Sequence, residues 1–162
     1  MLRVFDVSGE NVTITGSNTL VFINPPAAPG VSIRILRAWA SQHGTATSQQ
    51  IGIKHVTQVT AFPTLTSATP RPKALHDAAS AITGGTAGAA GTCGINASAE
   101  GAGTKTTRFA DGFNNLNGYL WVPTPAEVIE LSCGSASGYG LVLLTTPTTL
   151  TGWDFGVTFQ EY

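Results

Sequence analysis

Three histidines are the first candidates for metal binding or acid–base chemistry: His43, His55 and His76. Their spacing matches no metal-binding motif, and none lies in an H-E-x-x-H pattern. His55 continues the apolar face formed by Ile51 and Ile53, which favours a buried, hydrogen-bonded ring over a ligand or a base. The sequence therefore predicts no catalytic residue, no metal site and no cofactor, and we expect the protein not to be an enzyme.

Serine and carboxylate residues offer no clear catalytic pattern either. Ser135 and Ser137 lie between glycines, but neither has glycine two positions away on both sides, as a G-x-S-x-G nucleophile elbow requires. Glu127 and Glu130 are three apart in a strand-like segment, so we expect them on opposite faces and not as a catalytic pair. A β-sandwich hydrolase stays open only if the fold brings other carboxylates together.

The tryptophans could line a sugar-binding face, because exposed aromatic rings commonly stack on pyranose rings. These residues are Trp39, Trp121 and Trp153. Each lies within an apolar strand-like segment, which favours packing in a core. A carbohydrate- or receptor-binding module remains the alternative interpretation.

The two cysteines, Cys93 and Cys133, form neither a C-x-x-C pair nor a metal motif. The first six residues contain no apolar segment of the kind found in signal peptides, so we expect no secretion. Two reduced thiols are therefore favoured over a disulfide.

Alternation of apolar and polar residues predicts several strands. The clearest case is residues 153–159, where Trp153, Phe155, Val157 and Phe159 alternate with polar or small residues. Similar segments lie at 31–35, 51–54, 129–133 and 140–145, and a change of phase at 36–39 indicates a bulge. Six to nine such strands, separated by Gly/Pro-rich turns, predict one all-β domain over 1–162, an antiparallel, jelly-roll-like β-sandwich.

Four segments lead to more specific expectations. Residues 12–14 and 20–23 flank Gly16-Ser17-Asn18 and predict a hairpin. Residues 71–82 have a weak helical pattern, and residues 83–107 are rich in Gly, Ala and Thr and predict one long extended loop. Residues 1–8 are expected to form an N-terminal arm or an edge strand.

The chain carries unusually little charge. Its eight Lys and Arg and nine Asp and Glu make up 10% of the residues, against about 25% in a typical globular domain. The net charge of −1 and the scattered cations argue against nucleic-acid binding. No apolar run approaches the roughly 18 residues of a membrane helix. A surface of small uncharged residues instead suggests that the protein works within an assembly.

The C-terminal third has an order of parts that resembles a known family. Phe109-Ala110-Asp111-Gly112-Phe113-Asn114 leads to Gly118-Tyr119-Leu120-Trp121-Val122-Pro123-Thr124-Pro125-Ala126-Glu127, then to Gly140-Leu141-Val142-Leu143 and to Gly156-Val157-Thr158-Phe159-Gln160-Glu161. This order resembles the small head proteins of tailed bacteriophages, in particular jelly-roll-like decoration, or cement, proteins that bind the outside of capsids.

The resemblance implies a structural virion protein, assembled in the host cytoplasm and located on the capsid exterior. Its expected partners are the major capsid protein and further copies of itself, as a homotrimer or alternatively a dimer. A fibre or tail module that binds a carbohydrate or receptor is the alternative. We expect contacts from residues 1–6 and 83–105, with the candidates Leu2, Arg3, Phe5, Thr86, Thr92, Asn96 and Lys105.

Overall fold

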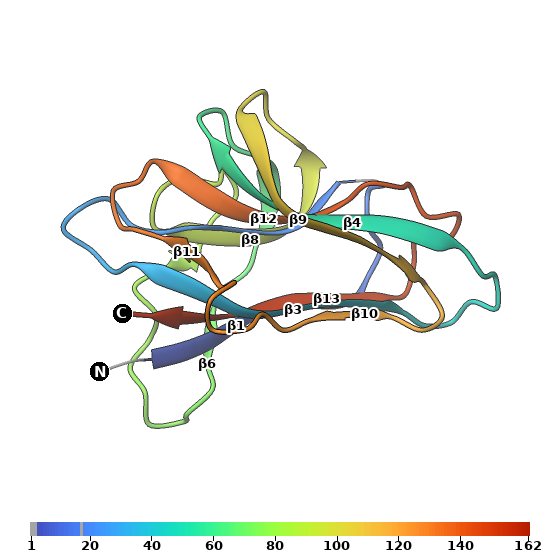
Figure 1. Cartoon of the computed structure of the whole chain (residues 1–162), viewed down its shortest axis with the longest axis horizontal. Coiled ribbons are helices and arrows are strands. Elements are labelled where there is room, and N and C mark those ends of the chain that lie inside the picture. The colour runs from blue at the N-terminus through green and yellow to red at the C-terminus, as the bar shows by residue number, and fades with distance from the viewer. Residues whose placement is uncertain (1–2, 17) are drawn as a thin grey trace.

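The computed structural model describes residues 3–16 and 18–162, and these form an all-β protein. Two sheets pack face to face as a β-sandwich, which confirms the predicted fold class (Figure 1). The described residues include no helix of the length and hydropathy needed to span a membrane.

The first sheet, sheet A, has the strand order β10-β3-β13-β1-β6, with β11 also paired to β3. Its strands are β1 (Arg3–Val12), β3 (Ile33–Gln42), β6 (Arg71–Pro72), β10 (Tyr119–Trp121), β11 (Ile129–Leu131) and β13 (Trp153–Glu161). All of these pairings are antiparallel. The strand β13 lies in the centre of sheet A, where it pairs with β1 on one side and with β3 on the other.

The second sheet, sheet B, has the order β5-β8-β2-β12-β4-β9, and β7 pairs in parallel with β8. Its strands are β2 (Thr19–Asn24), β4 (Gln50–Val59), β5 (Thr64–Ser67), β7 (Thr83–Gly84), β8 (Thr92–Ala99), β9 (Thr104–Asn114) and β12 (Ser137–Leu143). The long strand β9 is an edge strand and is mostly exposed.

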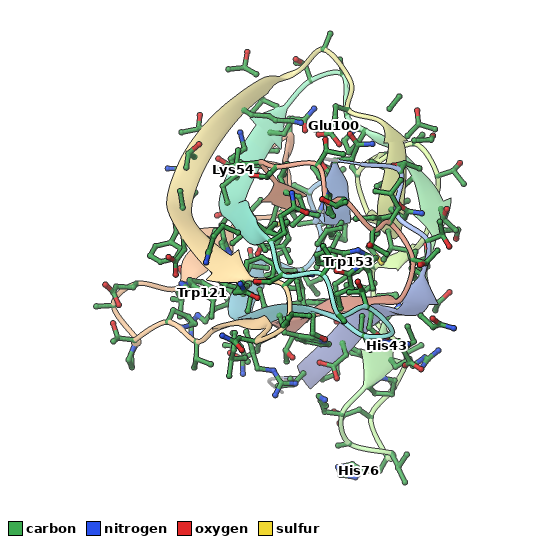
Figure 2. The ribbon with its side chains drawn as sticks, turned by 90° about the vertical axis from the view of Figure 1, so that its right-hand side faces the viewer. His43, Lys54, His76, Glu100, Trp121 and Trp153 are labelled. Atoms are coloured by element: carbon green, nitrogen blue, oxygen red, sulfur yellow. The ribbon has the colours of Figure 1, made fainter. Side chains whose placement is uncertain are left out.

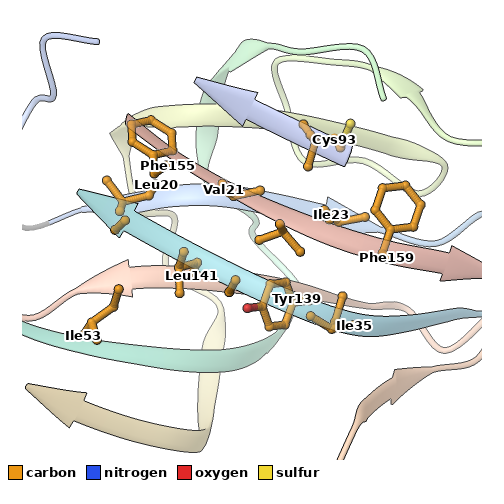
Figure 3. Packing of buried hydrophobic residues seen from close by; sticks show 14 of the residues in the cluster. Leu20, Val21, Ile23, Ile35, Ile53, Cys93, Tyr139, Leu141, Phe155 and Phe159 are labelled. Carbon is orange, nitrogen blue, oxygen red and sulfur yellow. The ribbon is translucent and has the colours of Figure 1, made fainter. Parts of the chain in front are cut away.

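The core lies between the two sheets. In β13 the side chains of Trp153, Phe155, Val157 and Phe159 are fully buried, as the alternation in the sequence predicts. Figure 3 shows Phe155 and Phe159 facing Leu20, Val21 and Ile23 of β2 across the interior. Non-directional burial of these large side chains is the main force that holds the sheets together.

A β-bulge in β3 shapes one edge of sheet A. Thr158 pairs with Arg37 and Phe159 pairs with Ile35, so Leu36 is the extra residue, within the segment where the sequence predicts a bulge. On its other side β3 pairs with β11 and with β10, which leaves residues 122–128 to arch past the bulge. Pro123 and Pro125 lie in this arch, where no ladder hydrogen bond is needed.

The predicted hairpin around Gly16 is wrong. The strand β1 belongs to sheet A and β2 to sheet B, so the chain crosses the sandwich between them. In the connection, Ile14 donates its amide to the Leu150 carbonyl at 2.9 Å. The Thr15 hydroxyl donates to the Ala97 carbonyl at 2.5 Å. These long-range partners replace the hydrogen-bond ladder that a hairpin would form. Residue 17 of the predicted turn lies outside the described residues.

The expected helix over 71–82 is also absent from this described segment. Arg71–Pro72 forms β6 against β1, and the chain then continues as a projecting loop. The Lys73 amide donates to the Val4 carbonyl at 2.9 Å, and Glu161 accepts the Ala81 amide at 3.0 Å. Backbone groups that would close a helical turn are therefore taken by sheet A.

The long loop expected over 83–107 is wrong as well, because this segment contains β7, β8 and the start of β9. Its glycines allow close packing. At Gly88, where φ is +60°, an added Cβ would lie 2.7 Å from the Phe62 side chain. The Asn24 side chain also donates to the Gly88 carbonyl at 2.8 Å. The segment lacks large side chains of its own but packs under the aromatic rings of its neighbours.

The described part of segment 1–8 is ordinary strand. From Arg3 onward it pairs with β13, and its other side pairs only at Phe5 and Asp6, with the short strand β6. It is therefore part of the sheet and not a free arm.

Candidate functional site

The buried histidine His55 forms a hydrogen-bonded group with two tyrosines in the interior. Its Nδ1 lies 2.8 Å from the Tyr139 hydroxyl and its Nε2 lies 2.9 Å from the Tyr119 hydroxyl. The neutral ring fits this arrangement, since one hydroxyl donates to the bare nitrogen and the other accepts the N–H. Burial lowers the pKa of His55 from 6.5 to about 4 and raises the pKa of both tyrosines. The prediction of a buried, hydrogen-bonded histidine is confirmed.

The histidine ties the two sheets together. His55 is in β4 and Tyr139 in β12, both in sheet B, whereas Tyr119 is in β10 of sheet A. Trp121 packs on the imidazole at 4.3 Å between ring centroids, and Phe109 meets it edge-on at 5.7 Å. The ring thus supports the edge of the sandwich where β9 and β10 approach each other.

The other ionisable side chains in residues 3–16 and 18–162 mostly form pairs. Among the described residues, no three His, Cys, Asp or Glu side chains are placed to hold a metal ion. His43 bonds Asp154 at 2.9 Å near the surface, and Asp154 also accepts the Asn11 amide at 2.7 Å. This pair fastens two connections at one end of sheet A.

The expected separation of Glu127 and Glu130 is wrong, because only Glu130 is in a strand and both residues line one hollow of about 330 Å³. Glu130 is paired with Arg34 at 2.6 Å, and Glu127 accepts the Thr124 hydroxyl at 2.7 Å. Both are exposed, whereas general-acid carboxyl groups are usually held in apolar pockets.

The outer face of sheet A carries an uncovered apolar surface, which we call the outer-face patch: Leu36, Arg37, Trp39 and Leu120. Trp39 lies flat over Gly156, where an added Cβ would come within 2.3 Å of the indole. The guanidinium of Arg37 lies 4.8 Å from the Trp39 ring, a cation–π contact. Leu120 pairs with Trp39 across the strands and is 66% exposed.

Part of the outer face of sheet B, around β2, β5 and β8, is covered. Phe22, Leu65 and Ala97 form a second buried cluster there, with Phe62 packed against it. Trp and Arg, which the outer-face patch contains, are residue types enriched at the energetic centres of protein interfaces.

Two hollows flank the outer-face patch. One, of about 210 Å³, lies between Trp39 and the turn at Asn117 and Gly118. The other, of about 230 Å³, lies between Leu36 and the proline-containing arch. The patch is therefore uneven and offers recesses to a partner's side chains.

A deeper side cleft opens at the edge of the sandwich, between β9 and the arch. It measures about 460 Å³ and is lined by Arg108, Phe109, Trp121, Val122, Pro123, Glu127 and Ile129. The rings of Phe109 and Trp121 lie 6.2 Å apart, and Val122 is 63% exposed. Figure 2 shows Trp121 at the side of the molecule, away from the loop that carries His76.

The predicted contact residues in the N-terminal segment do not form a free surface. Leu2 lies outside the described residues. The Arg3 guanidinium is held by Glu161 at 2.8 Å and by the Ala79 carbonyl at 3.0 Å. Phe5 is fully buried and stacks on Phe159. Its choice as a contact is wrong, since pairing of β1 with β13 turns Phe5 into the core.

The other predicted contacts lie in sheet B or, for Thr86, in the connection between β7 and β8, and they form hydrogen bonds or ion pairs within the chain. Thr86 is exposed and accepts the Leu65 amide through its carbonyl, and the Thr92 hydroxyl donates to Ala89. Asn96 bonds the connection between β1 and β2, and Lys105 pairs with Glu100.

The tryptophans divide between core and surface. Trp153 is fully buried, as expected, but Trp39 and Trp121 are only partly buried and belong to the outer-face patch and the side cleft. The sequence does contain a signal for the exposed residues. Alternation over residues 119–122 predicts that Leu120 and Val122 face outward when Tyr119 faces the core. Cys93 and Cys133 are free thiols, as expected, and Cys93 is buried.

A scan against protein-family models, a search of curated proteins and a search of solved structures each gave no match.

Proposed function

We propose that this protein is a structural protein of a tailed-bacteriophage virion, which binds the outer surface of the capsid as an oligomer and stabilises it. The observation that carries the proposal is the outer-face patch, a partly exposed Trp–Arg–Leu surface on sheet A. The sequence resemblance in residues 109–161 supplies the kind of partner, the major capsid protein.

The energetics of the patch suit a multivalent protein. Covering the exposed part of Leu120 contributes about 1–2 kcal/mol for each copy. A homotrimer multiplies such contacts through effective concentration. Because it binds only the assembled shell, it shifts the equilibrium toward the shell by mass action.

The test is binding to capsids assembled from the major capsid protein of the genome that encodes this chain. We expect binding to assembled capsids and much weaker binding to free subunits, with density on the capsid exterior by electron microscopy. Leu120→Asp should weaken binding at least tenfold. Leu144→Asp is the matched control, since Leu144 is a similarly exposed leucine, 51%, beyond β12 of sheet B. Absence of binding by the wild type, or equal loss in both variants, would contradict the proposal.

Carbohydrate or receptor binding by a fibre or tail module is the second candidate, and the side cleft favours it. Phe109 and Trp121 lie together there, with Arg108 and Glu127 able to bond hydroxyl groups. A glycan array tests it. Trp121→Ala is the informative variant because Trp121 is partly exposed, whereas loss of the buried Trp153 would disrupt the core. Array binding that Trp121→Ala abolishes in a folded protein would favour this candidate.

A further inference from the structure

The loop that follows β6 projects from the sandwich but is firmly held at both of its ends. At its start, Lys73 pairs with Asp6. At its end, the buried carboxylate of Glu161 accepts the Ser80 hydroxyl and the Ala81 amide while also pairing with Arg3. A turn closes the tip, where the Asp77 amide donates to the Ala74 carbonyl at 3.0 Å. The loop is therefore a positioned element of the surface.

The tip of this loop presents Leu75, whose side chain is 100% exposed. Figure 2 shows the neighbouring His76 at the far end of the loop, well beyond the sheets. Single exposed apolar residues are common on surfaces, but this one is held away from the body on a loop with fixed ends. Such a residue can enter a recess on another molecule with little loss of conformational entropy.

The side cleft is a recess of suitable chemistry on the same chain. It lies beside β10, at the opposite edge of sheet A from β6 and the loop. Its volume of about 460 Å³ exceeds what one leucine side chain needs, and Phe109, Val122 and Ile129 give it apolar walls. Glu127 at the cleft could meet the largely exposed His76 beside Leu75, an additional attraction when the histidine is protonated.

We propose, building on the oligomer in the function above, that Leu75 of one copy inserts into the side cleft of a second copy. The contact joins two different surfaces, so it is heterologous and leaves a free loop and a free cleft on the resulting dimer. Repetition closes a ring, such as the expected trimer, when the rotation between copies allows it.

Pairing of two β9 edges is the competing mode of self-association, and local structure disfavours it. A register shift between His55 and Val56 places a bulge at Arg108 in β9, which interrupts a straight edge. The Gly112 amide is already bonded to the Asp111 carboxylate at 2.7 Å. Both features reduce the free backbone groups that strand addition needs.

A mixing experiment tests the heterologous contact directly. Sedimentation and light scattering should show that Leu75→Asp and Val122→Asp each weaken self-association at least tenfold. The matched control Ala46→Asp, in an exposed segment, should associate like the wild type. A mixture of Leu75→Asp with Val122→Asp should form a 1:1 dimer, because the intact loop of the Val122→Asp variant can enter the intact cleft of the Leu75→Asp variant. Nothing larger should form, since the loop and the cleft left over on this dimer both carry the substituted aspartate. Circular dichroism must show that all variants are folded.

The results separate this contact from the capsid function. A monomeric wild type, unchanged association of Leu75→Asp, or no dimer in the mixture would overturn the loop-in-cleft contact, whatever the capsid assay shows. Normal self-association without capsid binding would instead refute the proposed function alone. A Leu75→Cys, Val122→Cys variant lacking Cys133 gives a second readout, since mild oxidation should produce reducible cross-links between copies.

Discussion

The burial of His55 predicts that the stability of the protein falls in mild acid. The folded state holds the ring neutral, with a pKa of about 4, whereas the unfolded chain takes up a proton near pH 6.5. The stabilising effect is therefore fully present above pH 6.5 and is lost as the pH falls from 6.5 to 4. A lowering from 6.5 to about 4 corresponds to a loss of about 3 kcal/mol in the free energy of unfolding.

This loss should be visible by chemical denaturation at closely spaced pH values. The steepest dependence from one group is about 1.4 kcal/mol per pH unit. Other ionisable groups also contribute to the pH dependence of stability, so the useful quantity is a difference between proteins. His55→Gln keeps a donor and an acceptor for the two tyrosines but does not titrate. Between pH 7 and pH 4, we expect the free energy of unfolding of the wild type to fall by about 3 kcal/mol more than that of His55→Gln.

A matched control is His43→Gln, which removes an exposed histidine paired with Asp154. It should keep most of the wild-type pH dependence. Nuclear magnetic resonance gives an independent check, since the His55 ring signals should show no protonation until the pH approaches 4. An ordinary titration of His55 near pH 6.5, or an identical pH dependence in His55→Gln and wild type, would refute the reasoning.

Three further predictions follow from buried polar groups. Tyr139→Phe leaves one nitrogen of a buried imidazole without a partner and should lower the free energy of unfolding by about 1–3 kcal/mol, measured by urea denaturation. Burial raises the pKa of Cys93 to about 12, so a thiol reagent at pH 8 should label Cys133 in the native protein and reach Cys93 only after unfolding. Glu161→Gln weakens the attachment of loop 73–81 and should speed tryptic cleavage after Lys73 several-fold, read by mass spectrometry.

The sequence was a good guide wherever a strand has one buried face. Residues 153–159 show this best, because alternation of side chains follows directly from the geometry of a half-buried strand. The bulge at Leu36 was visible for the same reason, as a break in that alternation. The predictions that are wrong concern segments whose structure depends on contacts with residues far away in the sequence. The segment 71–82 has local helical preference, but Glu161 and Val4, both distant in sequence, take its backbone donors.

The Gly/Ala-rich segment shows a second limit. The small side chains of residues 83–107 predict a loop, yet residues 92–99 form β8. Their packing depends on the large rings of Phe22 and Phe62, and sequence alone does not say which distant aromatic residue covers a given glycine. The outer-face patch was missed because Trp39 looks like a core residue until the covered and uncovered faces of the sheets are known.

The position of β13 bears on how the chain can fold during synthesis. Within the described residues, β13 follows every other strand in sequence, yet it lies between β1 and β3 and supplies pairing to both. At about 5–20 residues per second, roughly 6–22 s pass between synthesis of the end of β3 and of the start of β13. During that time two apolar strands lack their native partner, so sheet A completes only after Glu161 has left the ribosome. The nascent chain should therefore be a substrate for holding chaperones until that point.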